Sequence, residues 1–257
     1  VNHASLIGSF DNKPCVTENL QLHAWRSPNA PSLPEHLAVY GTDAAKVDAD
    51  QPWTAANAEA LDKRTLASWI NGLSASPLCK TGLHTLMMAD NGMVTEWQSY
   101  LANLAMVKGG GLDKYWSESE VYRCQGGNQQ LARKFVEAIG PARVLTRTIV
   151  RSIVVTDKNV RVTLASGKVL EGDHVILTAP PPVWNRIAIE PALPVGLVPQ
   201  MGTNVKFLMA VNGPFWRRAE LGPEMMTDGP VSATWHATDG QRGAGEVMVA
   251  FSGGTAA

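Results

Sequence analysis

CQGGNQQLARKF, residues 124–135, is the stretch where the pattern of this chain changes and from which its fold can be worked out. A glycine pair before a helix can bind a phosphate through its backbone N–H groups. The dinucleotide-binding fingerprint GxGxxG needs a third glycine in register, and none follows Gly126-Gly127. The pair is therefore predicted to form a tight turn. Asn128 can cap the helix that follows, whose apolar positions are Leu131, Phe135 and Ile139.

The segment after this helix predicts a small sheet. Val160, Val162 and Leu164 alternate with polar residues, as in a strand with one buried face. Ser166-Gly167 predicts a hairpin turn, and the apolar run 175–177 is typical of a strand buried on both faces. Further strands are expected at 204–211 and 246–251. Helix, strand and hairpin in succession indicate an α/β arrangement for this part of the chain.

Residues 51–108 predict a helical block, whereas residues 1–50 are expected to mix short strands and loops. Pro77 marks a break in the block, and Asn91-Gly92 predicts a helix end. Apolar residues recur at helical spacing in two stretches, which are Leu66, Trp69, Ile70 and Leu73, then Trp97, Leu101, Leu104 and Ala105.

Charge and composition exclude several classes of protein. The 257 residues carry 22 Lys and Arg against 23 Asp and Glu, so the basic face of a typical nucleic-acid binder is not expected. No apolar run reaches the roughly 18 residues of a membrane span, and no signal peptide is visible, which favours a cytoplasmic protein. The histidines are isolated and the three cysteines form no CxxC pair, so no metal site is predicted.

Lys206 is the most unusual charged residue of the chain, because it lies inside the apolar strand NVKFLMAV, 204–211. Alternation along a strand favours a lysine that faces solvent. A lysine on the buried face would be costly unless a function retained it. Taken from the residues alone, both interpretations stay open.

Five segments in order resemble the flavin-containing amine oxidases, the family of monoamine, polyamine and L-amino-acid oxidases. The upstream stretch 52–70 is also similar to the helical part of bacterial members, so the resemblance covers roughly residues 50–257. Each segment alone is a weak signal, and their order makes the series specific. The segments are YRCQGGNQQLARKF (122–135), VLTRTIVRSIVV (144–155), VRVTLASGKVLEGDHVILTAPPP (160–182), IEPALP (189–194) and NVKFLMAVNGPFWRR (204–218).

The resemblance implies a fold of two domains. It implies a mixed-sheet substrate-binding domain with a helical block, and a partial Rossmann-like FAD-binding domain, together an α+β or α/β protein. Residues 1–118 and 191–257 would form the two parts of the substrate-binding domain, and residues 119–190 the partial FAD-binding domain.

The resemblance also implies roles for single residues. The backbone of Val150 would bind the adenine of FAD, with Ile153 as its partner in the V-x-x-I pattern. Lys206 would hold a water at flavin N5 and is the catalytic candidate, which favours a functional over a structural lysine. Gln130 would line the substrate cavity. The remaining cofactor-binding candidates are Gly127, Thr178, Ala179 and Pro180.

The chemistry implied by the family is oxidation of an amine or amino acid. A neutral amine would bind with its α-carbon near flavin N5, lose a hydride equivalent and leave as an imine that is later hydrolysed, while O2 reoxidises the flavin and yields hydrogen peroxide. The amino-terminal GxGxxG and the carboxyl-terminal segment that closes over the flavin are not in this sequence. The chain is therefore expected to be the central portion of such an enzyme, inactive and weak in FAD binding when alone, with the missing portions of the same enzyme as partners.

Two other functions stay open at this point. The chain could be a non-catalytic binding module that keeps the substrate-domain fold, because fold alone does not decide function. It could also belong to a flavin desaturase or monooxygenase of the wider superfamily.

Overall fold

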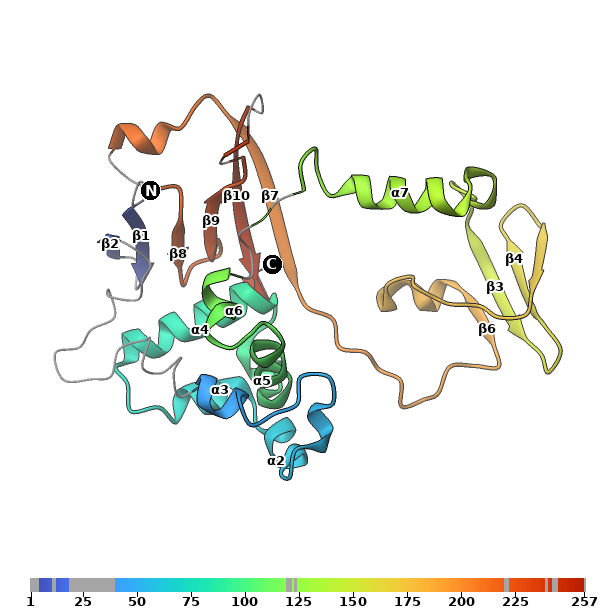
Figure 1. The fold of residues 1–257 in the computed structure, drawn as a ribbon, viewed down its shortest axis with the longest axis horizontal. Coiled ribbons are helices and arrows are strands. Elements are labelled where there is room, and N and C mark those ends of the chain that lie inside the picture. The colour runs from blue at the N-terminus through green and yellow to red at the C-terminus, as the bar shows by residue number, and fades with distance from the viewer. Residues whose placement is uncertain are drawn as a thin grey trace. The chain divides into compact units, whose positions relative to one another are not determined.

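The computed structural model consists of two compact units that alternate along the chain (Figure 1). The first comprises residues 1–121 and 202–257, and the second comprises residues 122–201. The assignment of domain roles along the sequence stays a prediction. The structure describes residues 5–10, 13–18, 40–118, 122, 124–219, 222–238, 240–241 and 245–256, so most of the uninformative amino-terminal stretch lies outside the described residues.

A mixed sheet organises the first unit. Over the described residues it has six strands in the order β2-β1-β8-β9-β10-β7, antiparallel throughout except for the parallel pair β1 and β8. The predicted strands at 204–211 and 246–251 are confirmed as β7 and β10. The strands are β1 (Ser5–Phe10), β2 (Lys13–Glu18), β7 (Asn204–Val211), β8 (Met225–Thr227), β9 (Ala233–His236) and β10 (Glu246–Gly253).

Helices of the same unit gather near one end of these strands, and α4 contacts both β8 and β10 (Figure 1). The predicted helical block is confirmed, and with the mixed sheet it gives the expected α+β fold. The α-helices are α2 (Ala58–Lys63), α3 (Leu66–Asn71), α4 (Pro77–Asn91), α5 (Tyr100–Gly109) and α6 (Asp113–Glu118). Short 3-10 turns are η1 (Pro52–Thr54), η2 (Thr95–Trp97), η5 (Phe215–Ala219) and η6 (Gly254–Ala256).

Local signals set the limits of α4. Pro77 is the first residue of the helix, where its missing N–H costs no hydrogen bond. The Oγ of Ser76 accepts a hydrogen bond from the Cys79 N–H at 3.2 Å and so caps the amino terminus. Gly92 ends the helix with a φ of 61°, as the sequence predicted.

The core of the first unit lies between α3, α4 and α5. Leu66, Ile70 and Leu83 are fully buried there, and Trp69 stacks on Tyr100. One prediction about this core is wrong, because Trp97 is 61% exposed. The chain turns through η2 and α5 begins only at Tyr100, so Trp97 is out of phase with the apolar side of α5. Further apolar members of the core cluster include Val47, Met87, Leu101, Leu104 and Val107.

The second unit contains one α-helix and a four-stranded sheet of order β5-β4-β3-β6 in its described part. β3, β4 and β5 are antiparallel neighbours, and β6 runs parallel to β3. The predicted turn at Ser166-Gly167 is confirmed, with a φ of 83° at Gly167. The elements are α7 (Gln129–Ile139), η3 (Pro141–Arg143), β3 (Val150–Val155), β4 (Val160–Leu164), β5 (Val169–Gly172), η4 (Pro181–Arg186) and β6 (Ala188–Glu190).

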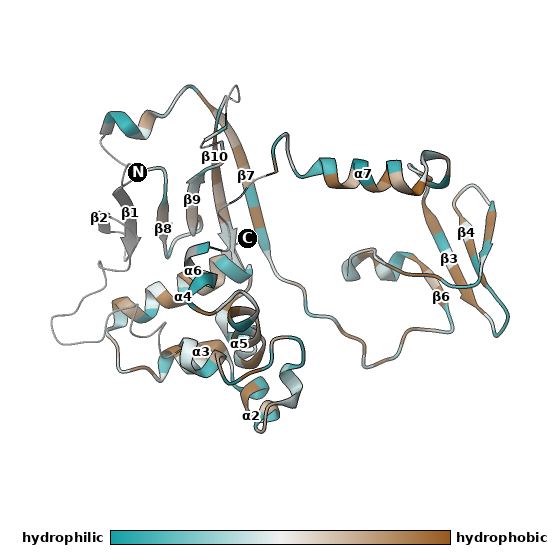
Figure 2. Ribbon diagram, viewed as in Figure 1, coloured by the Kyte–Doolittle hydropathy of each residue, from teal (hydrophilic) through white to brown (hydrophobic). Residues whose placement is uncertain are grey.

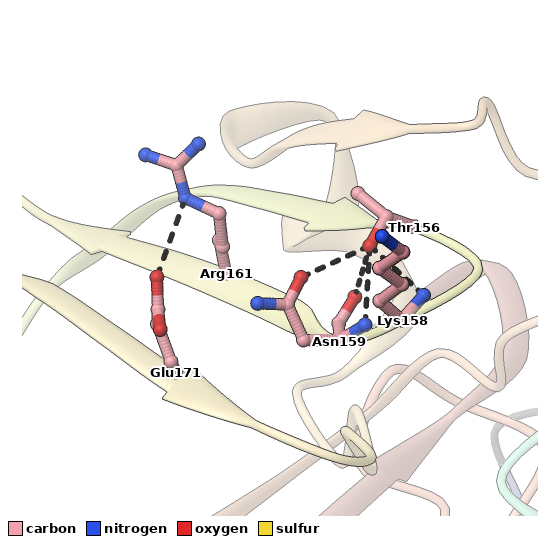
Figure 3. Close-up of polar contacts among 5 residues, drawn as sticks. All are labelled: Thr156, Lys158, Asn159, Arg161 and Glu171. Atoms are coloured by element: carbon pink, nitrogen blue, oxygen red, sulfur yellow. Dashed lines mark hydrogen bonds and ion pairs between the residues drawn. The ribbon is translucent and has the colours of Figure 1, made fainter.

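Polar side chains hold the strands of this sheet in register (Figure 3). In the turn between β3 and β4, the Thr156 Oγ1 accepts hydrogen bonds from the N–H groups of Lys158 and Asn159 at 3.2 and 3.1 Å. Arg161 and Glu171 face each other across β4 and β5, with 3.9 Å between Nε and Oε1. These exposed contacts specify the meander and contribute little to its stability.

The prediction of a buried strand at 175–177 is wrong. The structure forms no strand there, and Ile176 is 86% exposed. A buried strand needs hydrogen-bonded neighbours, and no described strand pairs with this segment. The apolar residues of α7 are also exposed, between 51% and 64% at Leu131, Phe135 and Ile139, and Figure 2 shows hydrophobic colour recurring along this helix.

Candidate functional site

Lys206 lies in β7 at the edge of the six-stranded sheet, in a ladder of eight residue pairs with β10. It is paired with Phe251, and two residues along the same ladder Leu208 is paired with Val249. On the other side of β10, Val249 is paired with Trp235 of β9. Paired residues, and residues two apart on a strand, lie on the same face of a sheet. Lys206, Phe251 and Trp235 therefore share one face.

The Lys206 ammonium lies over two aromatic rings. Its Nζ is 5.3 Å from the centre of the Trp235 ring and 5.7 Å from that of Phe251. The two ring centres are 6.1 Å apart. These distances lie within the range of cation–π attraction, in which the negative face of a ring attracts a cation. Lys206 itself is exposed, and so are Val205 and Phe207 on the other face of β7, so alternation along this strand does not explain its exposure.

Gly126-Gly127 forms the tight turn expected from the sequence. The N–H of Gly127 donates to the Cys124 carbonyl at 2.9 Å, and the φ values of the two glycines are 81° and 95°. Such positive angles favour glycine. Gln130 closes the turn, because its Nε2 donates to the carbonyls of Gln125 and Gly127. Asn128 precedes α7 as predicted, but its side chain makes no capping hydrogen bond.

Val150 is the first residue of β3 and is half-buried. On one side it is paired with Leu164 of β4. On the other side β6 pairs only with residues 152–154 of β3, so the described part of the sheet ends before Val150. Among the described strands, only β4 therefore pairs with Val150.

Residues 178–180 lead into η4 and are held by it. The indole N–H of Trp184 donates to the Ala179 carbonyl at 2.6 Å, and the Val183 N–H donates to the Pro180 carbonyl at 3.0 Å. Thr178 stays exposed. These contacts set the course of the backbone and leave the Thr178 side chain available.

A match to a protein-family model identifies the family of this chain. The model described as flavin containing amine oxidoreductase matches residues 13–257. The chain belongs to the flavin-containing amine oxidoreductase family. This is the family that the resemblance predicted, and its description names a flavin and amine oxidoreduction.

Relatives in this family are distant and longer than this chain. The chain is 23% identical over 221 residues to "Probable flavin-containing monoamine oxidase A" of Dictyostelium discoideum, an alignment that covers 80% of this chain and 47% of that protein. It is 26% identical over 188 residues to an L-amino acid dehydrogenase of Synechocystis, with 71% and 39% covered. The chain thus spans less than half the length of these two relatives.

Solved structures of the family share the fold. Wild-type putrescine oxidase bound to putrescine aligns with 99% of this chain and 58% of its own, at a TM-score of 0.78 and 18% identity. At this identity the likeness supports the fold alone. The agreement extends over both units of the chain.

Sequence reasoning singled out Lys206 but missed its aromatic partners. Trp235 and Phe251 come from two other strands, and only strand order and register bring them to the lysine. Of the other candidates, hydrogen bonds among the described residues join only Gln130 to Gly127. Lys206 belongs to the first unit and the other six candidates belong to the second.

The described residues lack two further features. They contain no group of three or more His, Cys, Asp or Glu side chains placed to hold a metal ion. None of their helices has the length and hydrophobicity needed to span a membrane. Sequence reasoning also missed a contact of the buried His236, whose Nε2 lies 2.5 Å from the Glu246 Oε2.

Proposed function

We propose that this chain is the central portion of an FAD-dependent amine oxidase, which oxidises the C–N bond of an amine or amino acid to an imine and reduces O2 to hydrogen peroxide. The observation that carries the proposal is the family match along residues 13–257. The putrescine bound in a structural neighbour is an amine, which agrees with this class of substrate. Bound FAD would take up the hydride equivalent from the α-carbon of the amine.

We expect FAD to bind to residues of the second unit. β6 does not pair with Val150, so the edge of β3 there would offer backbone groups to the adenine, as a strand edge offers them to any hydrogen-bonding partner. The positive φ of Gly127 lets the backbone turn closely at the start of α7. Thr178, Ala179 and Pro180 would line the cofactor where η4 holds the backbone.

Gln130 and Lys206 would act on the substrate side. The Nε2 of Gln130 is engaged in the turn, so its carbonyl oxygen is the group that would accept a hydrogen bond from an amine N–H. Lys206 would hold a water near flavin N5 through its ammonium, which can donate three hydrogen bonds. The protein would orient the amine and the water, while the cofactor supplies the redox step.

We also propose that the chain needs further polypeptide to hold FAD. The chain spans 47% and 39% of two relatives, and large apolar residues on α7 and β7 are exposed. Phe207 and Leu208 are 61% and 63% exposed on β7. Adjacent exposed apolar side chains of this size are unusual on the surface of a complete enzyme. The missing portions of the same enzyme would cover these residues and complete the pyrophosphate site.

The test is to express the complete reading frame that contains this chain. The purified protein is expected to show the absorbance of a bound flavin and to release peroxide in air with members of a panel of amines and L-amino acids. The 257-residue chain alone is expected to lose its flavin on desalting. Retention of the flavin by the isolated chain would sink the proposal of a central portion. A complete protein without flavin would support a binding module instead.

A second candidate is an amine dehydrogenase that passes its electrons to an acceptor other than O2. The observation that favours it is the relative named L-amino acid dehydrogenase. The same purified protein separates the two functions. An oxidase consumes O2 and forms peroxide, whereas a dehydrogenase reduces an artificial electron acceptor under nitrogen and forms little peroxide in air.

A further inference from the structure

We propose that Trp235 and Phe251 are positioning residues for Lys206, and that their two rings hold the lysine ammonium at one place over the sheet. The proposal rests on the proposed function only for its effect on activity. The arrangement itself is a property of this chain. The aromatic pair contacts the Lys206 ammonium of the same chain and no separate ligand is proposed.

Among the described residues, Lys206 has two aromatic rings as partners. Its Nζ lies 5.3 and 5.7 Å from the two ring centres. Within the described ranges no carboxylate lies within ion-pair distance of it, although exposed lysines elsewhere, such as Lys134 with Glu137, form such pairs. An exposed lysine without a carboxylate usually samples many rotamers. Here the ring faces supply the attraction that would restrict it.

The rings of Phe251 and Trp235 are themselves held in place by the sheet. Phe251 is 5% exposed and lies in β10, which is hydrogen-bonded on both sides, to β7 and to β9. Trp235 is half-buried and its ring lies 6.1 Å from that of Phe251. The pairing of Lys206 with Phe251 stands within a continuous ladder of eight pairs, so the lysine cannot slip along the strand without breaking that ladder. A fixed aromatic surface therefore faces a residue of fixed register.

An aromatic pair that holds the Lys206 ammonium would affect catalysis through the position of the water that this lysine binds. A group that holds a reacting water must keep its place, because a displacement of about 1 Å can cost on the order of a hundredfold in rate. A lysine has four side-chain torsions, and an aromatic pair that attracts its charged end reduces that freedom. The alternative is that only the apolar stem of Lys206 packs on the rings while the ammonium moves freely in water.

Nuclear magnetic resonance of the isolated chain, with lysine labelled with carbon-13, tests the arrangement directly. Ring currents should shift the Lys206 ε-CH2 protons upfield from those of other exposed lysines. The Lys206 signal is assigned from its loss in Lys206→Met. Trp235→Leu and Phe251→Leu should each reduce the shift, and Trp235→Phe should keep part of it. The control Trp53→Leu removes an exposed tryptophan of η1, which is 68% exposed, and should leave the shift unchanged.

Two results would overturn the arrangement. One is a Lys206 ε-CH2 signal at the position of a free lysine in the wild-type chain. The other is an upfield shift that persists in Trp235→Leu and Phe251→Leu while their spectra show the wild-type fold. If Phe251→Leu fails to fold, the test is decided by Trp235→Leu and Trp235→Phe, because Trp235 is only half-buried.

Activity of the complete enzyme then tests the role. Trp235→Leu should lower kcat for amine oxidation between about tenfold and a hundredfold, with KM for the amine unchanged, and Trp235→Phe should restore part of the rate. A ring-current shift that Trp235→Leu abolishes without any change in kcat would overturn the positioning role. Absence of oxidase or dehydrogenase activity in the wild-type enzyme would instead refute the proposed function and leave the arrangement standing.

Discussion

Lys206 of β7 lies directly opposite Phe251 of β10, and the lysine Nζ is 5.7 Å from the centre of the phenylalanine ring. The phenylalanine is buried while the lysine is exposed, so this residue pair contains one side chain of the core and one of the surface. The stability of this sheet and the position of the candidate catalytic lysine are therefore coupled through a single side chain.

Phe251→Ala should destabilise the first unit strongly. The ring is 5% exposed, and truncation of a buried phenylalanine to alanine costs about 3–5 kcal/mol through lost burial and a cavity. Urea unfolding followed by circular dichroism measures the loss. Phe207→Ala is the matched control, since this neighbouring ring of β7 is 61% exposed and its removal should cost less than about 1 kcal/mol. Equal losses in the two variants would contradict the burial assigned to Phe251.

Gly92→Ala should destabilise the junction between α4 and β7. Its φ of 61° costs an alanine about 1–2 kcal/mol, and an added Cβ would lie 2.5 Å from the Asn204 Nδ2. Combining it with Asn204→Ala removes the closest contact but keeps the Asn204 Cβ at 3.2 Å and the backbone strain, so the double variant should regain only part of the loss. Gly245→Ala, where no atom lies within 4 Å of the added Cβ, is the control and should be close to neutral. A neutral Gly92→Ala would show that this turn adopts another conformation.

Ser76→Ala should weaken the start of α4 by about 0.5–2 kcal/mol, because it removes the hydroxyl that accepts the Cys79 N–H. Ser74→Ala is a close control, since Ser74 is exposed and lies outside the helix. Thermal unfolding of both variants beside the wild-type chain measures the difference. The cap assignment fails if both substitutions lower the midpoint equally.

His84 should make the first unit less stable at acidic pH. Burial lowers the pKa of His84, and the nearby Glu96 carboxylate opposes this shift more weakly. The neutral ring lies 2.6 Å from the Thr95 Oγ1 through Nδ1 and 3.3 Å from the Asn71 Oδ1 through Nε2. Because the unfolded state binds the proton more readily, stability should fall as the pH drops below the ordinary histidine pKa of about 6.5, until the folded-state pKa is passed.

The measurement is the urea midpoint between about pH 7.5 and pH 5, a range that brackets the ordinary pKa of histidine. His84→Gln should be less stable than the wild type at neutral pH and should lose less stability on acidification. His174→Gln removes an exposed histidine of the second unit and is the control for the number of histidines. A wild-type slope that His84→Gln leaves unchanged would assign the pH dependence to another group.

Several elements could be predicted because their signals are local. The end of α4 at Gly92 and the hairpin turn at Gly167 both depend on glycine adopting a positive φ, which neighbouring residues already indicate. Trp97 was misplaced because helical spacing across a turn gives no sign that the helix has stopped. The run at 175–177 was misplaced because an apolar run becomes a strand only beside another strand.

The sequence by itself indicated the family, the helical block, the helix after Gly127 and the strands at 160–164, 204–211 and 246–251, and it singled out Lys206 as a candidate. These follow from local propensity, from periodicity and from motifs in a fixed order. Only the tertiary structure decided that Trp235 and Phe251 face that lysine. Alternation tells which residues of one strand share a face, but strand order and register depend on pairing between distant segments, and that pairing is set by the packing of the whole sheet.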